Sequence, residues 1–360
     1  MRGSLRTPVR GKSQGAWLEQ KTQQTIIITV LIFLPYRLSS IPRVIINCEY
    51  HLVIKLSDII DNTIILNEKL NIFYKKVSFI KLYASTVKNN TNKALEDLFN
   101  KKERIEKISA DPEIPFEMKD SNGIELRNFS FNSPYTGESE FIDRKKLKID
   151  ERIDIVNLHK NKQYQWLLVE AYEAYEKYLK ELYACIGFID HSFWPARDFG
   201  DISLSEIPHQ DMIWFSSQVE QKKDKPKSIL LTLRKKIPSI IQIELNNENT
   251  INYQFATLMI ENFRHIIVHH NGNFNNKTDF TTQLFQKLSI KNNLKPTFEN
   301  YLNQYTGNKD GVDFILLLER DIKRGLIGLM YHDRLDILIN ILLSHALILK
   351  TETIKYLSNK

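Results

Sequence analysis

Residues 163–186, QYQWLLVEAYEAYEKYLKELYACI, limit the possible folds more than any other stretch of the chain. Apolar side chains recur there at steps of three and four residues, and glutamates and lysines fill the positions between them. This period is typical of an amphipathic α-helix with one buried face. The residues expected on that face are Leu168, Ala171, Tyr172, Tyr175, Leu179, Leu182 and Ile186.

Three later segments also predict helices, at residues 227–237, 251–270 and 332–350. Pro238 is expected to end the first of them, because proline lacks the amide hydrogen that a helix interior needs. Strand-like alternation is not convincing in this half of the chain, so we expect a helical bundle over residues 149–350. The predicted fold class is mainly α, with a smaller α+β region preceding the bundle.

The α+β region is predicted at residues 46–148. Short β-branched runs between residues 44 and 66 favour strands, and the glycine-free stretch 75–108 favours a helix. Prolines and glycines then crowd residues 111–150, which indicates a loop-rich connection or a small strand pair. We therefore place a domain boundary at residue 148.

Residues 1–45 are interpreted as an N-terminal extension, either disordered or the product of a mis-assigned start. Their apolar run at residues 25–34, TIIITVLIFL, is much shorter than the roughly 20 residues that cross a bilayer. The basic leader before it is long for a signal peptide, and no A-x-A cleavage pattern follows. A buried strand or an unstructured extension is favoured over a secretion signal.

The composition is that of a globular protein, with 42% hydrophobic and 26% charged residues among 360. A formal net charge of +7 favours an anionic partner such as RNA. Cys48 and Cys185 are the two cysteines, and they lack CxxC spacing. This argues against a disulfide framework or a thiolate zinc site, and favours the cytoplasm.

The segment 261–274, ENFRHIIVHHNGNF, brings an arginine and three histidines to the end of a predicted core helix. At about 100° per residue, His265 and His269 lie opposite the apolar face, whereas His270 lies on the core side. Asn271-Gly272 predicts the end of the helix. The residues expected on the apolar face are Ala256, Met259, Ile260, Phe263, Ile266 and Ile267.

Two interpretations of this segment do not involve catalysis. The first is that the polar residues only cover the surface and cap the helix. The second is a metal site, because His265 and His269 have the i, i+4 spacing of helix-borne zinc ligands. The H-E-x-x-H pattern is not met, since Ile266 follows the first histidine, and no third ligand is evident.

Arg264, four intervening residues and His269 resemble the R-x4-6-H signature of HEPN-domain proteins. The helix at residues 163–186 is similar to the first helix of that family, and the resemblance extends over residues 150–350. It implies a helical, metal-independent ribonuclease of a defence or toxin–antitoxin system. It also implies a homodimer, with the arginine and histidine of both copies facing each other and an antitoxin protein as a further partner.

The chemistry of the residues agrees with this implication. Metal-free RNA cleavage needs a base for the ribose 2′-hydroxyl and a cation for the phosphate, and no cofactor. We expect Arg264 to bind phosphate, His269 to act as base or acid, and His265 to assist. Asn271 contacts substrate or caps the helix. Arg264 and His269 lie about 140° apart around one helix, so a second copy would complete the site more easily.

Residues 222–236 carry a dense set of cations that could hold an RNA backbone or form a solvated face. Aromatic residues at 193, 194 and 199 could stack on bases or be buried.

Asp321 and Lys323 faintly resemble a restriction-type nuclease core, but that core needs strands and this region is expected to be helical. The alternative function is a catalytically inactive HEPN-like module that binds a nucleotide, RNA or a protein. The expected substrate-binding lysines are Lys222, Lys223, Lys225, Lys235 and Lys236.

Overall fold

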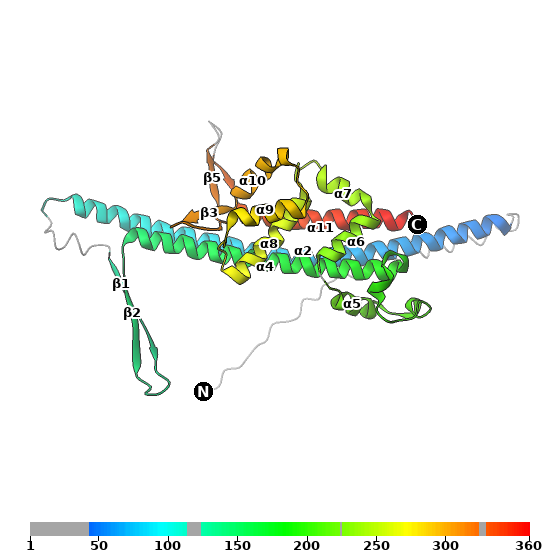
Figure 1. The fold of residues 1–360 in the computed structure, drawn as a ribbon, viewed down its shortest axis with the longest axis horizontal. Helices are drawn as coiled ribbons and strands as arrows, with labels where there is room; N and C mark the ends of the chain where they lie inside the picture. The colour runs from blue at the N-terminus through cyan, green and yellow to red at the C-terminus, as the bar shows by residue number, and fades with distance from the viewer. Residues whose placement is uncertain (1–42, 114–123, 224, 324–328) are drawn as a thin grey trace, which may run out of the picture. The chain divides into compact units, whose positions relative to one another are not determined.

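The computed structural model describes residues 43–113, 124–223, 225–323 and 329–360. It divides the chain into two units, Met1–Ile60 and Asp61–Lys360. The expected extension at residues 1–45 lies almost wholly outside the described residues, as does its apolar run. The described part is mainly α with small two-stranded sheets, which confirms the predicted fold class (Figure 1).

Helix α2, Arg43–Ala110, corrects the prediction of strands between residues 44 and 66, because the backbone there is one continuous helix of 68 residues. The predicted helix at residues 75–108 is part of it and is confirmed. Isoleucine-rich runs are ambiguous between strand and helix. Directly after these runs the buried residues Leu66, Leu70, Phe73, Val77 and Ile80 recur at helical spacing.

These five side chains of α2 belong to the same apolar core as the C-terminal helices. Residues 61–110 therefore fold with the second unit. The structural division at Ile60/Asp61 differs from the boundary expected at residue 148. Residues 46–148 contain most of the long helix α2 and the β1–β2 hairpin, and α2 buries one face in the main core.

An antiparallel hairpin connects α2 to the next helix, which agrees with the expected strand pair. Strand β1, Glu125–Asn132, pairs with β2, Ser139–Leu147, and the register shifts between Phe129 and Ser130. Apolar side chains such as Phe129 and Phe141 are exposed on it. The hairpin contributes little to the core.

Helix α4, Ile149–Ile189, contains the helix predicted at residues 163–186 and extends it in both directions. It begins where Glu151 Oε2 accepts a hydrogen bond from the backbone N–H of Lys148 at 2.7 Å. Its apolar face is buried and contacts several other helices, among them α11, which runs beside it in Figure 1. Helix α4 is the central element of the second unit.

The aromatic segment after α4 folds into three short 3-10 helices, η1, η2 and η3, followed by a helix, α5. Phe193, Trp194 and Phe199 are buried in it, so their rings pack in the core instead of facing bases. The indole nitrogen of Trp194 donates to the backbone oxygen of Tyr183 at 3.0 Å. Helix η1 comprises His191–Phe193, η2 comprises Ala196–Phe199, η3 comprises Ile207–His209 and α5 comprises Met212–Gln221.

The three other predicted helices are also confirmed. They are α6, Lys227–Lys236, α8, Tyr253–His270, and α11, Arg334–Ser358. Pro238 does end the first helical segment, and it also begins a new helix, α7, Pro238–Leu245. Proline fits there because the first turn of a helix needs no amide donor.

The region between α8 and α11 contains elements that the sequence did not predict. Residues 320–323 are a strand, which corrects the helical expectation there, and the side chains of Asp321 and Lys323 lie outside the described residues. The elements are α9, Lys277–Lys287; η4, Asn292–Leu294; α10, Lys295–Asn303; the strand pair β3, Thr306–Lys309, with β4, Val312–Ile315; and the pair β5, Arg320–Lys323, with β6, Leu329–His332.

Among the described residues, α11 is the one helix long and apolar enough to cross a bilayer. Half of its apolar window is buried within the protein. It contacts α4, α7 and α8, and its buried side chains include His345 and Glu352. These are the features of a core helix.

Candidate functional site

Helix α8 carries the arginine–histidine motif, and its packing fixes which side chains reach solvent. Asn252 caps its start by accepting a hydrogen bond from the backbone N–H of Phe255 at 2.9 Å. The predicted apolar face is buried against the core. The buried residues on it are Ala256, Met259, Ile260, Phe263, Ile266 and Ile267.

The helix ends at Asn271, which adopts the left-handed conformation with φ 53°, and at Gly272 with φ 76°. Lys162 on α4 donates to the backbone oxygen of Asn271 and, at 3.0 Å, to its side-chain oxygen. The backbone N–H of Ile315 donates to the oxygen of Gly272 at 2.9 Å. Asn271, expected to cap the helix or contact substrate, thus has a structural role in this turn.

The imidazoles of His265, His269 and His270 are exposed and close together at the end of α8. The ring centres of His265 and His269 are 4.5 Å apart, and those of His265 and His270 are 6.1 Å apart. The expectation that His270 lies on the core side is wrong. His270 is the last residue of α8, and its side chain is exposed there.

Partial burial lowers the pKa of His265, and the neighbouring His269, His270 and Arg264 lower it further because they favour the neutral ring. A neutral imidazole can accept a proton or a hydrogen bond. This cluster therefore contains a group suited to general-base chemistry at neutral pH.

Arg264 lies on the flank of α8 that faces α4. Its Nη2 is 3.4 Å from Oε1 of Glu173, and about a third of its side chain is exposed. Its Nε is buried without a hydrogen-bond partner among the described residues. A long, partly solvated ion pair is weak, so the guanidinium could exchange Glu173 for a phosphate.

Arg264 and His269 do not contact each other in the described part of one chain. The arginine faces Glu173, and the closest ring to His269 is that of His265. The three histidines thus form one group, with Arg264 at its side. Within one chain the imidazole cluster and the guanidinium therefore lie on the same part of the surface, but they do not contact each other.

The basic segment before α8 contains two kinds of lysine. Lys222 is nearly buried, pairs with Asp198 and lies over the ring of Tyr183. Lys225 pairs with Glu220 at 3.2 Å. Lys223, Lys235 and Lys236 are exposed. Only the exposed lysines can bind a phosphate backbone without losing a buried contact.

No cluster of three or more His, Cys, Asp or Glu side chains suited to a metal ion occurs in the described parts of the chain. The two helix-borne histidines, His265 and His269, thus have no third ligand there. Zinc sites need at least three protein ligands. The metal-site interpretation gains no support from the described residues.

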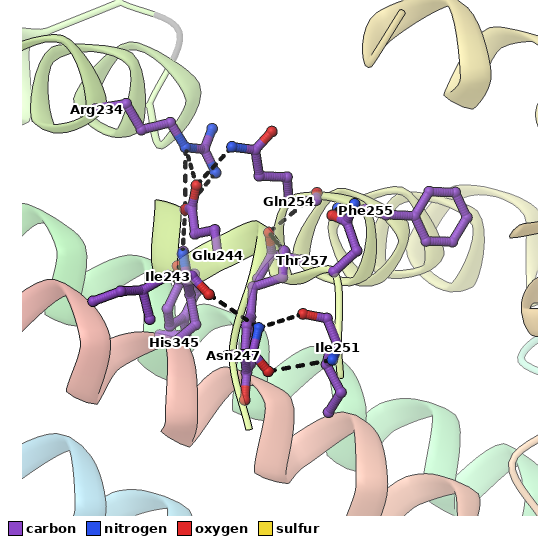
Figure 2. Close-up of polar contacts among 12 residues, drawn as sticks. Arg234, Ile243, Glu244, Asn247, Ile251, Gln254, Phe255, Thr257 and His345 are labelled. Carbon is purple, nitrogen blue, oxygen red and sulfur yellow. Dashed lines mark hydrogen bonds and ion pairs between the residues drawn. The ribbon is translucent and has the colours of Figure 1, made fainter. Parts of the chain in front are cut away.

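A buried polar network in the middle of the second unit was not anticipated from the sequence. His345 Nε2 is 2.7 Å from Oε1 of Glu244, and both side chains are completely buried. Arg234 Nη2 donates to Glu244 Oε1 at 2.8 Å, and Gln254 donates to Glu244 Oε2 at 2.8 Å (Figure 2). Tyr175 completes the network through a 2.5 Å contact with His345 Nδ1.

The proton positions in this network follow from its donors and acceptors. A carboxylate only accepts, so His345 donates from Nε2 to Glu244, and its Nδ1 accepts from the Tyr175 hydroxyl. Burial lowers the pKa of His345, whereas the donors around Glu244 overcome its burial and lower its pKa to about 2. The histidine is therefore neutral and the glutamate ionised.

The sequence did contain a signal for His345. It follows Leu338 and Leu342 at core spacing on an apolar helix, and Leu349 continues the same face. A histidine at a core position needs hydrogen-bond partners, and their identity depends on helices distant in the sequence.

No protein-family model matches this chain, and comparison with curated proteins and with solved structures likewise gave no match.

Proposed function

We propose that this protein is a metal-independent endoribonuclease of HEPN type that acts in a defence or toxin–antitoxin system. The observation that carries the proposal is the exposure of three imidazoles and part of a guanidinium on the last turns of α8. The opposite face of the same helix is buried. A surface arginine–histidine group on a rigid core helix is a suitable platform for acid–base chemistry on a phosphodiester.

In the proposed reaction His269 takes the proton from the ribose 2′-hydroxyl, and the resulting oxygen attacks the neighbouring phosphorus. The P–O5′ bond breaks, leaving a 2′,3′-cyclic phosphate, and the leaving 5′-oxygen becomes a hydroxyl by taking the proton that His269 had removed. Arg264 stabilises the charge on the phosphate oxygens. His265, whose pKa is lowered, assists by hydrogen bonding.

A homodimer is part of the proposal because Arg264 and His269 do not meet within one chain. A two-fold axis near the end of α8 would bring the arginine of one copy toward the histidine of the other. Sedimentation of the purified protein should therefore give the mass of two chains. A monomer that cleaves RNA would contradict this part of the proposal.

Exposed lysines before α8 are proposed to hold the RNA backbone. Lys223, Lys235 and Lys236 are available for this role, while Lys222 and Lys225 would keep the segment in place through their ion pairs. The proposed enzyme acts in the cytoplasm, where its RNA substrate and a cognate antitoxin protein would be found.

The test is RNA cleavage by the purified protein in the presence of EDTA. We expect 2′,3′-cyclic phosphate ends, and we expect His269→Ala to reduce the rate by roughly 10²-fold to 10⁴-fold, the usual contribution of general acid–base catalysis. His159→Ala is the matched control, because His159 is an exposed histidine on α4. It should cleave at the wild-type rate.

Equal inactivity of the wild type and both variants would overturn the ribonuclease proposal. The catalytically inactive binding module would then take its place. Two contacts favour that alternative, since Arg264 already has Glu173 as a partner and Asn271 is held by Lys162. Both residues then serve the fold alone.

A further inference from the structure

A cavity of about 250 Å³ lies beside the buried network, walled by α4, α6, α8 and α9. Tyr175 and Arg234 line it and also belong to the network, while Glu244 and His345 do not line it. The cation of the Arg234–Glu244 pair thus lies on the cavity side. Its carboxylate partner lies behind it, fully buried.

Charge is distributed unequally around this cavity. Lys227 and Lys287 are exposed at its wall, and Glu261 is the carboxylate there. Burial raises the pKa of Glu261, Lys287 and Lys227 partly offset this effect, and the carboxylate of Glu176 adds to it. Because Glu244 balances the charge of Arg234, the excess of positive charge at the cavity wall comes from Lys227 and Lys287 against Glu261.

The remaining wall is largely apolar. Leu230 and Leu258 come from α6 and α8, and Tyr172 adds an aromatic ring from α4. A concave apolar surface with a few convergent polar groups is the usual form of a small-molecule site. Buried ionisable groups with displaced pKa values gather at such sites more often than elsewhere.

We propose that this cavity binds a small organic anion, an apolar body carrying one phosphate or carboxylate group. The charged group lies between Lys227 and Lys287, with the fixed guanidinium of Arg234 below it. The body packs against the leucines and Tyr172. Because Glu244 holds two nitrogens of Arg234, the guanidinium keeps its position with or without ligand, and binding loses little side-chain entropy.

The test is calorimetric titration of the full-length protein with phenyl phosphate, phenylacetate and inorganic phosphate. At least one of the two organic anions should bind, and more tightly than inorganic phosphate, which lacks the apolar body. Binding of one of them alone identifies the charged group as phosphate or carboxylate. Failure of both, or equal binding of inorganic and phenyl phosphate, overturns the proposal.

Three variants place the ligand in this cavity. The double variant Lys227→Ala/Lys287→Ala should weaken binding by roughly fivefold or more, as expected for two lost charge contacts. Glu261→Gln should tighten it, since a like charge is removed. Lys291→Ala, at an exposed lysine outside the cavity, is the control and should leave affinity unchanged.

Wild-type affinity in both the double variant and Glu261→Gln would overturn the assignment of the cavity. Thermal unfolding of each variant establishes that the fold is retained. The proposal is independent of RNA cleavage, because the motif histidines do not line this cavity. Failure of either proposal therefore leaves the other in place.

Discussion

His345 is the residue whose chemistry depends most on its surroundings. It is completely buried and neutral in the folded protein, since burial lowers its pKa below the ordinary 6.5. In the unfolded chain it would take up a proton once the pH falls below about 6.5. The unfolded state then binds more protons than the folded state, so acidification must reduce stability.

We predict that the free energy of unfolding decreases as the pH falls from 7 to 5, through the His345 transition. Glu244 extends the loss of stability to lower pH, because its pKa of about 2 in the folded protein is below the 4.5 that is ordinary for a glutamate. His345→Gln should show a shallower decrease between pH 6.5 and 5. Urea unfolding at several pH values measures the slope.

His265 and His332 also have lowered pKa values, so part of the slope should remain in that variant. His159→Gln, at an exposed position, is the control and should keep the full wild-type slope. A slope in His345→Gln equal to that of the wild type would contradict a neutral, buried histidine in the network.

At the residue scale the sequence predicted the buried face of α8 better than the exposure of the side chain at the end of this helix. The apolar face follows from periodicity alone, and it is confirmed. His270 was misplaced because a helical wheel gives only the direction of a side chain and cannot show whether the core extends to the last residue of the helix. The partners of His345 were unpredictable because they lie 170 and 101 residues away in the sequence, on other helices.

At the scale of elements, the end of α8 depends on a close approach between two segments. A Cβ added at Gly272 would lie 2.4 Å from Oε1 of Gln165 on α4. Gln165 is buried and donates to the backbone oxygen of Ile315 at 2.7 Å. Gly272 therefore has two reasons to be glycine: its φ of 76° and the side chain beside it.

We predict that Gly272→Ala lowers the free energy of unfolding by about 2–4 kcal/mol, the sum of backbone strain and overpacking. Gly311→Ala is the matched control, because Gly311 has φ 80° but no atom within 4 Å of an added Cβ. It should cost about 1 kcal/mol, from the backbone alone. Equal losses of unfolding free energy in the two variants would show that the Gln165 side chain moves away from the added methyl group without an energetic cost.

Helix α2 shows why element type was harder to predict than periodicity. The runs of isoleucine and valine at residues 44–66 fit a strand as well as a helix, and no proline or glycine marks a boundary there. The helical spacing of its buried residues becomes evident only over several turns. The short strands β3 to β6 were missed because four residues give too little pattern to detect.

On the scale of the whole molecule, the core of the second unit needs a helix that precedes the predicted domain. Leu66, Phe73 and Ile80 of α2 are buried in the same core as α4 and α11. Lys81 on α2 also pairs with Asp336 on α11 at 2.8 Å. The arginine–histidine motif therefore depends on a fold that begins at residue 61.

We predict that a chain starting at Asp61 unfolds in a single cooperative transition, whereas a chain starting at Asp111 does not fold. The shorter chain loses six buried apolar side chains, each worth about 2–5 kcal/mol, which together reach the whole stability of a typical domain. Thermal unfolding followed by circular dichroism measures the difference. A cooperative unfolding transition in the chain that starts at Asp111 would mean that α2 covers the core but is not required for folding. The boundary predicted at residue 148 would then describe the folding unit better than a boundary that includes α2.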